Sequence, residues 1–102
     1  MRMTKQRKEK VTKSSGNVFV DLGFPPEEAM LLAMRADLMV RLRLLIEDRG
    51  WTQVHAASEF GISQSRVSDL KRGKWEKFSL DGLLTLAARA GLKPRLVFSR
   101  AA

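Results

Sequence analysis

The sequence predicts an all-α domain of four to five helices that ends in one short β-strand. Three observations support this prediction. Apolar residues recur every three or four positions through most of the chain, as they do on one face of an α-helix. Capping residues and glycines divide that pattern into segments of helical length. The segment Leu92–Ser99 holds apolar residues that run together without helical spacing.

A long helix is predicted from the Pro25–Glu28 segment to Arg49. Proline suits the first turn of a helix because its missing N–H has no acceptor there, and early acidic residues favour the positive end of the helix dipole. Gly50 then provides a C-terminal stop. At ~1.5 Å per residue this helix would be roughly 36 Å long. That is long for a chain of this size, so we expect its first half to project or to pack against another chain.

Three shorter helices follow, each opened by a hydroxyl residue of the kind that caps a helix N-terminus. Thr52 begins a helix that runs through Glu59, and Ser63 begins one that runs to about Lys71. Ser79 begins the last, which Gly91 ends. Ahead of the long helix, Val18–Leu22 forms a short apolar patch, either a turn of helix or an extended segment.

The C-terminal segment 93–99 is predicted to be a β-strand because Leu96, Val97 and Phe98 stand together beyond Pro94. A lone strand cannot satisfy its own backbone hydrogen bonds. It therefore needs a partner, and a second copy of this chain is the simplest one. The strand thus predicts a homodimer.

Composition excludes several classes of function. The chain has 102 residues, of which 44% are apolar, enough for one domain with a small core. It has no cysteine and one histidine, His55, so we expect no disulfide, no metal site, no cofactor and no catalytic residue. The longest apolar stretch, Met30–Ile46, is interrupted by charges, and Met1 leads into charged residues rather than a signal peptide. We expect a cytoplasmic, nucleoid-associated protein with no membrane contact.

The formal charge of +8 indicates a polyanionic partner. Six basic residues and one acidic residue fall within 1–16, which we expect to be a disordered basic arm preceding a domain at 17–99. That arm could remain solvated with weak phosphate contacts, lie along DNA or order on a protein partner. A second basic cluster at 64–77 lies in a more informative pattern.

Residues 52–73 have the spacing of a helix-turn-helix. Ala57 provides the small side chain where two helices meet, and Gly61 stands in the turn, where a left-handed backbone is easiest without a Cβ. Val67 anchors the second helix to the first, and Ile62 and Leu70 complete its apolar underside. These demands leave the remaining side chains of the second helix pointing largely outward.

The outward set is polar, as a helix that enters the major groove requires. Gln64 could pair with adenine, Arg66 could take guanine or a phosphate, and Asp69 could accept from cytosine or pair with an arginine. Gln53 is placed to reach a phosphate beside its helix N-terminus. The candidate DNA-binding residues are Thr52, Gln53, Ser63, Gln64, Ser65, Arg66, Ser68, Asp69, Lys71, Arg72 and Lys74.

The segment Trp51–Gly73 resembles the helix-turn-helix of the lambda-repressor/Cro group, also called the XRE group. The matching residues are Gln53, Ala57, Gly61, Gln64, Ser65, Val67 and Leu70. The segments 16–24 and 78–83 are in addition similar to small regulators akin to HigA-type antitoxins. The resemblance implies a lambda-repressor-like DNA-binding homodimer, in which the C-terminal strand pairs across the dimer. It also implies autorepression and, as an alternative main function, neutralisation of a small ribonuclease toxin by direct contact.

Other functions fit the sequence less well. Nothing in it assembles a nucleophile with a base or a phosphate-binding glycine loop, which argues against an enzyme. RNA binding is disfavoured because the narrow major groove of A-form RNA excludes a recognition helix. Sequence-specific binding of double-stranded DNA, as a transcriptional regulator and in particular a repressor on an inverted repeat, is the function that the sequence predicts.

Overall fold

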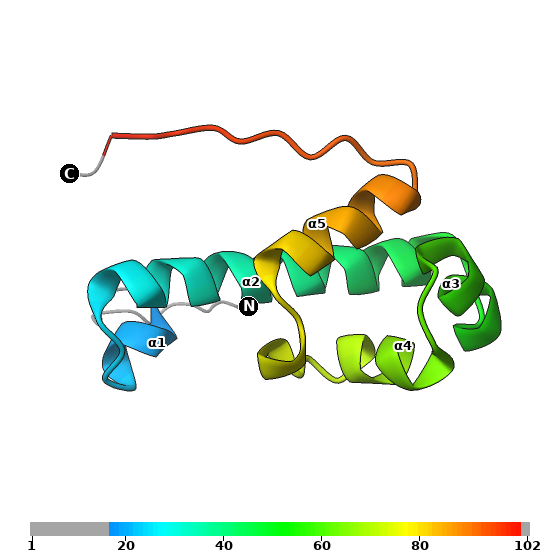
Figure 1. Cartoon of the computed structure of the whole chain (residues 1–102), viewed down its shortest axis with the longest axis horizontal. Coiled ribbons are helices and arrows are strands. Elements are labelled where there is room, and N and C mark those ends of the chain that lie inside the picture. Colours follow the sequence, from blue (N-terminus) through cyan, green and yellow to red (C-terminus); the bar gives the residue numbers. More distant parts are fainter. Residues whose placement is uncertain (1–16, 101–102) are drawn as a thin grey trace, which may run out of the picture.

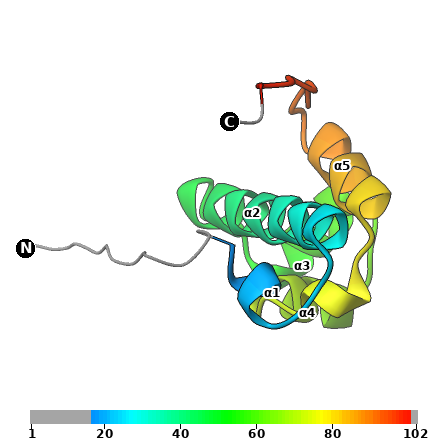
Figure 2. The ribbon, with the colours of Figure 1, turned by 90° about the vertical axis from the view of Figure 1, so that its left-hand side faces the viewer.

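The computed structural model describes residues 17–100, so the predicted arm at 1–16 lies outside the described residues. The elements are α1 (Val18–Asp21), α2 (Pro26–Asp48), α3 (Gln53–Phe60), α4 (Gln64–Lys71), the 3-10 helix η1 (Trp75–Lys77) and α5 (Leu80–Arg89). The long helix α2 forms the axis of the molecule, with α4 and α1 on one side and α5 on another (Figures 1 and 2). The all-α prediction is confirmed for this part of the chain.

The three short helices begin where local chemistry predicts. The hydroxyl of Thr52 accepts a hydrogen bond from His55 N at 3.0 Å, and that of Ser63 accepts from Arg66 N at 3.2 Å. Ser79 caps α5 in the same way. Each hydroxyl satisfies one of the backbone N–H groups that have no acceptor within the helix. The long helix likewise starts at Pro26 and ends at Asp48, just before Gly50.

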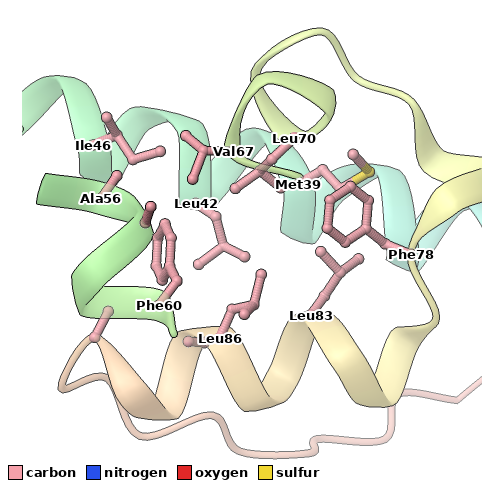
Figure 3. Packing of buried hydrophobic residues seen from close by; sticks show 13 residues of the cluster. Met39, Leu42, Ile46, Ala56, Phe60, Val67, Leu70, Phe78, Leu83 and Leu86 are labelled. Carbon is pink, nitrogen blue, oxygen red and sulfur yellow. The ribbon is translucent and has the colours of Figure 1, made fainter. Parts of the chain in front are cut away.

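The main core lies where α2, α3, α4 and α5 meet (Figure 3). Helix α2 contributes Met39, Leu42 and Ile46, which face Phe60 of α3 and Val67 of α4. Phe78, just before α5, and α5 itself close the other side of this cluster. Because α4 contributes only its apolar underside, its opposite face remains on the surface.

A second cluster holds the N-terminal end of α2. Phe19 of α1 is buried against Ala29 and Leu32, and Phe24 and Trp75 pack around it. The Val18–Leu22 patch is therefore a turn of helix, and it covers part of the first half of α2. Other side chains of that half face solvent: Met30 is 55% exposed and Met34 40%. Within residues 17–100, no helix is long and apolar enough to cross a membrane.

The predicted C-terminal β-strand is wrong for the single chain. Residues 93–99 run as an extended segment, and the part of the chain that the structure describes contains no strand. The segment lies on the opposite side of α2 from α4, and all of its side chains are exposed (Figures 1 and 2). Apolar composition predicts an extended backbone, but a strand also requires a neighbouring strand to pair with. The described fold offers none.

Candidate nucleic-acid interface

The turn between α3 and α4 sets the angle of the two helices. Gly61 has φ +69°, and the following Ile62 N–H donates back to Ala57 O at 3.0 Å. This is the hydrogen-bond pattern of a helix that ends in a left-handed residue. Ala57 and Ile62 both pack on the main core, while Val67 and Leu70 are fully buried beneath α4. The sequence-based geometry of the helix-turn-helix is confirmed at these positions.

Replacement of Gly61 tests how strictly the turn depends on a left-handed backbone. We expect Gly61→Ala to lower the free energy of unfolding by about 1–2 kcal/mol, because a Cβ disfavours positive φ. That Cβ would in addition lie 3.0 Å from Arg89 Nη1. Urea unfolding followed by circular dichroism measures the loss. Gly61→Asn adds the same Cβ but tolerates this backbone better, so it should lose less; an equal loss would show that contact with Arg89, rather than backbone strain, dominates.

The predicted DNA-binding residues lie at the N-termini of α3 and α4, along α4 and in the segment that follows it. The exposed members are Thr52, Ser63, Gln64, Ser65, Arg66, Lys71 and Arg72. Gln53, Ser68, Asp69 and Lys74 are half-buried. The second helix therefore presents its polar side outward, although Ser68 and Asp69 are less open than the sequence suggests.

Gln53 joins the starts of the two helices. Its side-chain Nε2 donates to the backbone carbonyl of Gln64 at 3.0 Å. The bond ties the α3 N-terminus to the first turn of α4 and uses only the backbone of Gln64. The side chain of Gln64 is left free to point into solvent. The predicted phosphate contact of Gln53 thus comes from a side chain that already positions α4.

The basic segment after α4 is anchored through Trp75. The Trp75 ring lies edge-on to Phe19, with 5.3 Å between ring centroids, and to Phe24 at 6.5 Å. Its backbone carbonyl accepts a hydrogen bond of 3.4 Å from Arg35 Nη1 on α2. Lys74 and Lys77 flank this anchored residue in the chain. The contacts of Trp75 with Phe19 and Phe24 therefore position the backbone that carries the candidate DNA-binding residue Lys74 and the neighbouring basic residue Lys77.

Arg66 also holds this segment. Its Nη2 donates to the carbonyl of Lys77 at 2.7 Å, and its guanidinium carbon lies 4.6 Å from the centre of the Phe78 ring. The side chain thus bridges α4 and the start of α5. The sequence suggested only a base or phosphate contact for Arg66, since neither the hydrogen bond nor the ring contact leaves a local sequence signal.

Two further arginines were missed by sequence reasoning. Arg35 stands three residues after Leu32 and four before Met39, which places it on the same helical face as these two core residues. An arginine on that face was the sequence signal that could have identified it. Arg89 Nη1 donates to the carbonyl of Phe60 at 2.9 Å and so satisfies a backbone acceptor at the end of α3. Both arginines position helices of the interface and are not part of its outer surface.

The charge of the surface favours anions. Lys71, Arg72, Lys74 and Lys77 surround the α4 C-terminus, with Glu76 the acidic residue among them. Within residues 17–100, no ion pair includes Asp69, so its predicted pairing with an arginine is not formed here. Glu59 Oε2, on α3, lies 3.4 Å from His55 Nε2. Among the same residues, no group of three or more acidic or histidine side chains could hold a metal ion.

The comparison with protein families places residues 18–97 in a helix-turn-helix domain family. This match spans most of the chain, and the chain belongs to that family. No curated protein matches the sequence. The family is one of DNA-binding domains found in regulators and is typically non-enzymatic, which agrees with the exposed polar helix and its basic flank.

Proposed function

We propose that this member of the helix-turn-helix domain family is a transcriptional regulator. It binds double-stranded DNA in a sequence-specific way and acts as a repressor. The observation that supports this most is α4: a capped, exposed, polar helix fixed on a core and followed by an anchored basic segment. A helix of this kind fits the major groove, where hydrogen-bonding side chains distinguish the base pairs. Binding to the chromosome would place the protein at the nucleoid.

The candidate DNA-binding side chains divide into those that contact bases and those that contact the phosphates of the DNA. Gln64 is suited to adenine, while Ser65 and Ser68 allow close approach to base edges. Asp69, half-buried at the edge of the surface, is suited to the amino group of cytosine. Arg66 keeps N–H groups beyond the one bonded to Lys77, so it can reach guanine or a phosphate. The proposed phosphate contacts are Thr52, Gln53, Ser63, Lys71, Arg72 and Lys74.

The test is binding of duplex DNA from upstream of the gene, measured by fluorescence anisotropy at physiological salt beside a scrambled duplex of equal length. A regulator that reads sequence should bind the upstream duplex at least about 10³-fold more tightly. Equal affinity for both duplexes would contradict sequence-specific regulation and would assign the binding to charge alone, because non-specific contacts to phosphates are insensitive to sequence.

Homodimerisation on an inverted repeat is part of the proposal. Leu96, Val97 and Phe98 are 71%, 75% and 88% exposed. Adjacent apolar side chains with this much exposure favour an interaction surface. These three residues belong to the extended C-terminal segment, which runs on the opposite side of α2 from α4 (Figure 1). An interface there leaves both copies of α4 free. On DNA the two copies of α4 should stand ~34 Å apart, or a multiple of that distance.

Charging the C-terminal segment should separate the dimer. We expect Leu96→Asp combined with Phe98→Asp to raise the dimer dissociation constant more than tenfold, since burial of each such side chain contributes about 1.5–3 kcal/mol. Sedimentation equilibrium at micromolar concentration measures it. Ser99→Asp adds a charge to the same segment without removing an apolar group, and it should leave the dimer intact. A wild-type protein that is already monomeric would contradict the homodimer.

An antitoxin is the alternative function. The same exposed apolar side chains that favour a second copy could instead cover a small ribonuclease toxin, with DNA binding left to autorepression of the operon. Co-expression with the neighbouring genes and purification through a tag on this chain separates the two functions. A stoichiometric ribonuclease partner, inactive in the complex and active when released, would favour the antitoxin; recovery of the homodimer alone would favour the stand-alone repressor.

A further inference from the structure

An open pocket lies between α4 and α5, beside the proposed DNA-binding surface. It encloses about 240 Å³. Ile62, Phe78 and Leu86 provide apolar walls, and the latter two are more than nine-tenths buried. Arg66 and Arg89 line the same space. Of the proposed DNA-contacting side chains, Arg66 lines the pocket, while Gln64, Ser65 and Ser68 do not.

Both arginines of the pocket are held in place by backbone carbonyls. Arg89 donates to Phe60 O at 2.9 Å, and Arg66 donates to Lys77 O at 2.7 Å while lying over the Phe78 ring. A guanidinium carries five N–H donors, so each of these side chains retains donors beyond that bond. Because these side chains are already ordered, a ligand that binds them pays a smaller entropic cost of immobilising them. The pocket therefore presents two ordered donor groups.

Among the residues that the structure describes, no acidic side chain lines the pocket. Two guanidinium groups without a neighbouring carboxylate form a receptor for an anion, and the fork of a guanidinium matches the two oxygens of a carboxylate. The hydroxyls of Ser79 and Thr85 add polar groups at the edge. The apolar walls in turn favour a ligand with an apolar body, because a fully hydrated anion such as inorganic phosphate would leave them uncovered.

We propose that this pocket binds a small organic carboxylate with an apolar body. Its volume lies below the usual range for drug-sized ligands, which indicates a molecule with a single ring or a short branched chain. The carboxylate binds between the two guanidinium groups, and the body lies against Phe78 and Leu86. Burial of one face of such a molecule together with one charge-assisted contact corresponds to a dissociation constant of about 1 mM.

The pocket is coupled to DNA through Arg66. This side chain borders the pocket and also fixes the carbonyl of Lys77 in the basic segment. A bound carboxylate neutralises positive charge beside the DNA-binding surface and competes for the donors of Arg66. Binding of the ligand therefore lowers the affinity for DNA, and binding of DNA lowers the affinity for the ligand. By linkage the two effects are equal in free energy. This coupling, unlike the pocket itself, rests on the proposed function.

The test is an NMR titration of the full-length ¹⁵N-labelled protein with phenylacetate, a ring that bears one carboxylate. Amide shifts are expected at Ile62, Gly82 and Thr85, with a dissociation constant near 1 mM. Phenylacetamide keeps the shape without the charge and inorganic phosphate keeps a charge without the ring. Both should bind at least tenfold more weakly. Equal shifts with either compound would overturn the proposed chemistry, as would shifts scattered over surface lysines.

Two variants locate the ligand. Thr85→Trp fills the pocket from an exposed position and should abolish the shifts, whereas Ala88→Trp adds the same bulk one turn away and should preserve them. Arg89→Lys keeps the charge but loses the fork and should weaken binding severalfold. Thermal unfolding of each variant verifies that it is folded. Phenylacetate that binds Thr85→Trp as well as the wild type would overturn the assignment of the site.

DNA anisotropy in saturating phenylacetate tests the coupling. The affinity of wild-type protein for its specific duplex should fall by about fivefold or more, the lower end of usual allosteric couplings, and that of Thr85→Trp should not change. An unchanged wild-type affinity would overturn the coupling. A protein that binds phenylacetate at these residues but prefers no duplex would contradict the proposed function alone.

Discussion

Phe60→Ala is expected to lower the free energy of unfolding by about 3–5 kcal/mol, which is a large part of the stability of a domain of this size. The side chain is fully buried at the C-terminal end of α3, where it faces Leu42 and Leu86 (Figure 3). Its ring is also edge-on to Trp51, with centroids 5.8 Å apart. Removing it opens a cavity at the point where α2, α3 and α5 meet, and the helix-turn-helix loses the core on which α4 rests.

Urea unfolding monitored by far-ultraviolet circular dichroism measures this loss, and DNA binding should disappear wherever the variant is unfolded. Val54→Ala on the same helix is the matched control. Val54 is 60% exposed, so its truncation should change stability by no more than about 0.5 kcal/mol. An unfolding midpoint for Phe60→Ala within error of the control would show that the core relaxes around the cavity and that α3 is not held by this residue.

Local chemistry predicted the helices of this protein because their ends are determined within a few residues. Thr52, Ser63 and Ser79 each bond to a backbone N–H three residues on. Gly61 adopts a left-handed backbone that residues with a Cβ would disfavour at this position. Such interactions require no knowledge of the rest of the fold. The same holds for the apolar underside of α4, because Val67 and Leu70 lie on one helical face.

Features that depend on distant partners could not be predicted in this way. The segment at 93–99 has the composition of a strand, but strand formation is a property of a pair of segments. Arg66 reaches Lys77 over 11 positions, Arg89 reaches Phe60 over 29 and Arg35 reaches Trp75 over 40. Each bond ends on a backbone carbonyl, and a carbonyl is present at every residue. No residue type in the sequence therefore identifies the acceptor.

These contacts change how the candidate site is understood. A basic residue in a helix-turn-helix is readily assigned to DNA on charge alone, yet Arg66 also bridges α4 and the chain before α5. Its replacement would remove a positive charge, a ring contact and a hydrogen bond at once, so a loss of DNA binding in an Arg66 variant would not identify a base contact. Gln64 gives a cleaner test, because its backbone carbonyl, and not its side chain, carries the bond from Gln53.

Gln64→Ala should therefore lower the affinity for the specific duplex by about 1–3 kcal/mol and leave the affinity for random duplex unchanged. Lys74→Gln is the contrasting variant. It keeps most of the half-buried side chain but removes the charge, so it should weaken both duplexes alike and reduce the salt dependence by about one unit of slope. Anisotropy titrations over a series of salt concentrations measure the two effects together.

The two variants separate the reading of sequence from attraction to phosphate. If Gln64→Ala weakens random and specific DNA equally, Gln64 contacts the backbone and α4 does not present it to the bases. If Lys74→Gln instead lowers only specific affinity, the segment around Trp75 lies closer to the groove than its basic composition indicates. The expected pattern, a specific loss at Gln64 and a general loss at Lys74, is that of α4 lying in the groove with the anchored segment on the phosphates, because a base contact depends on sequence and a phosphate contact depends on salt.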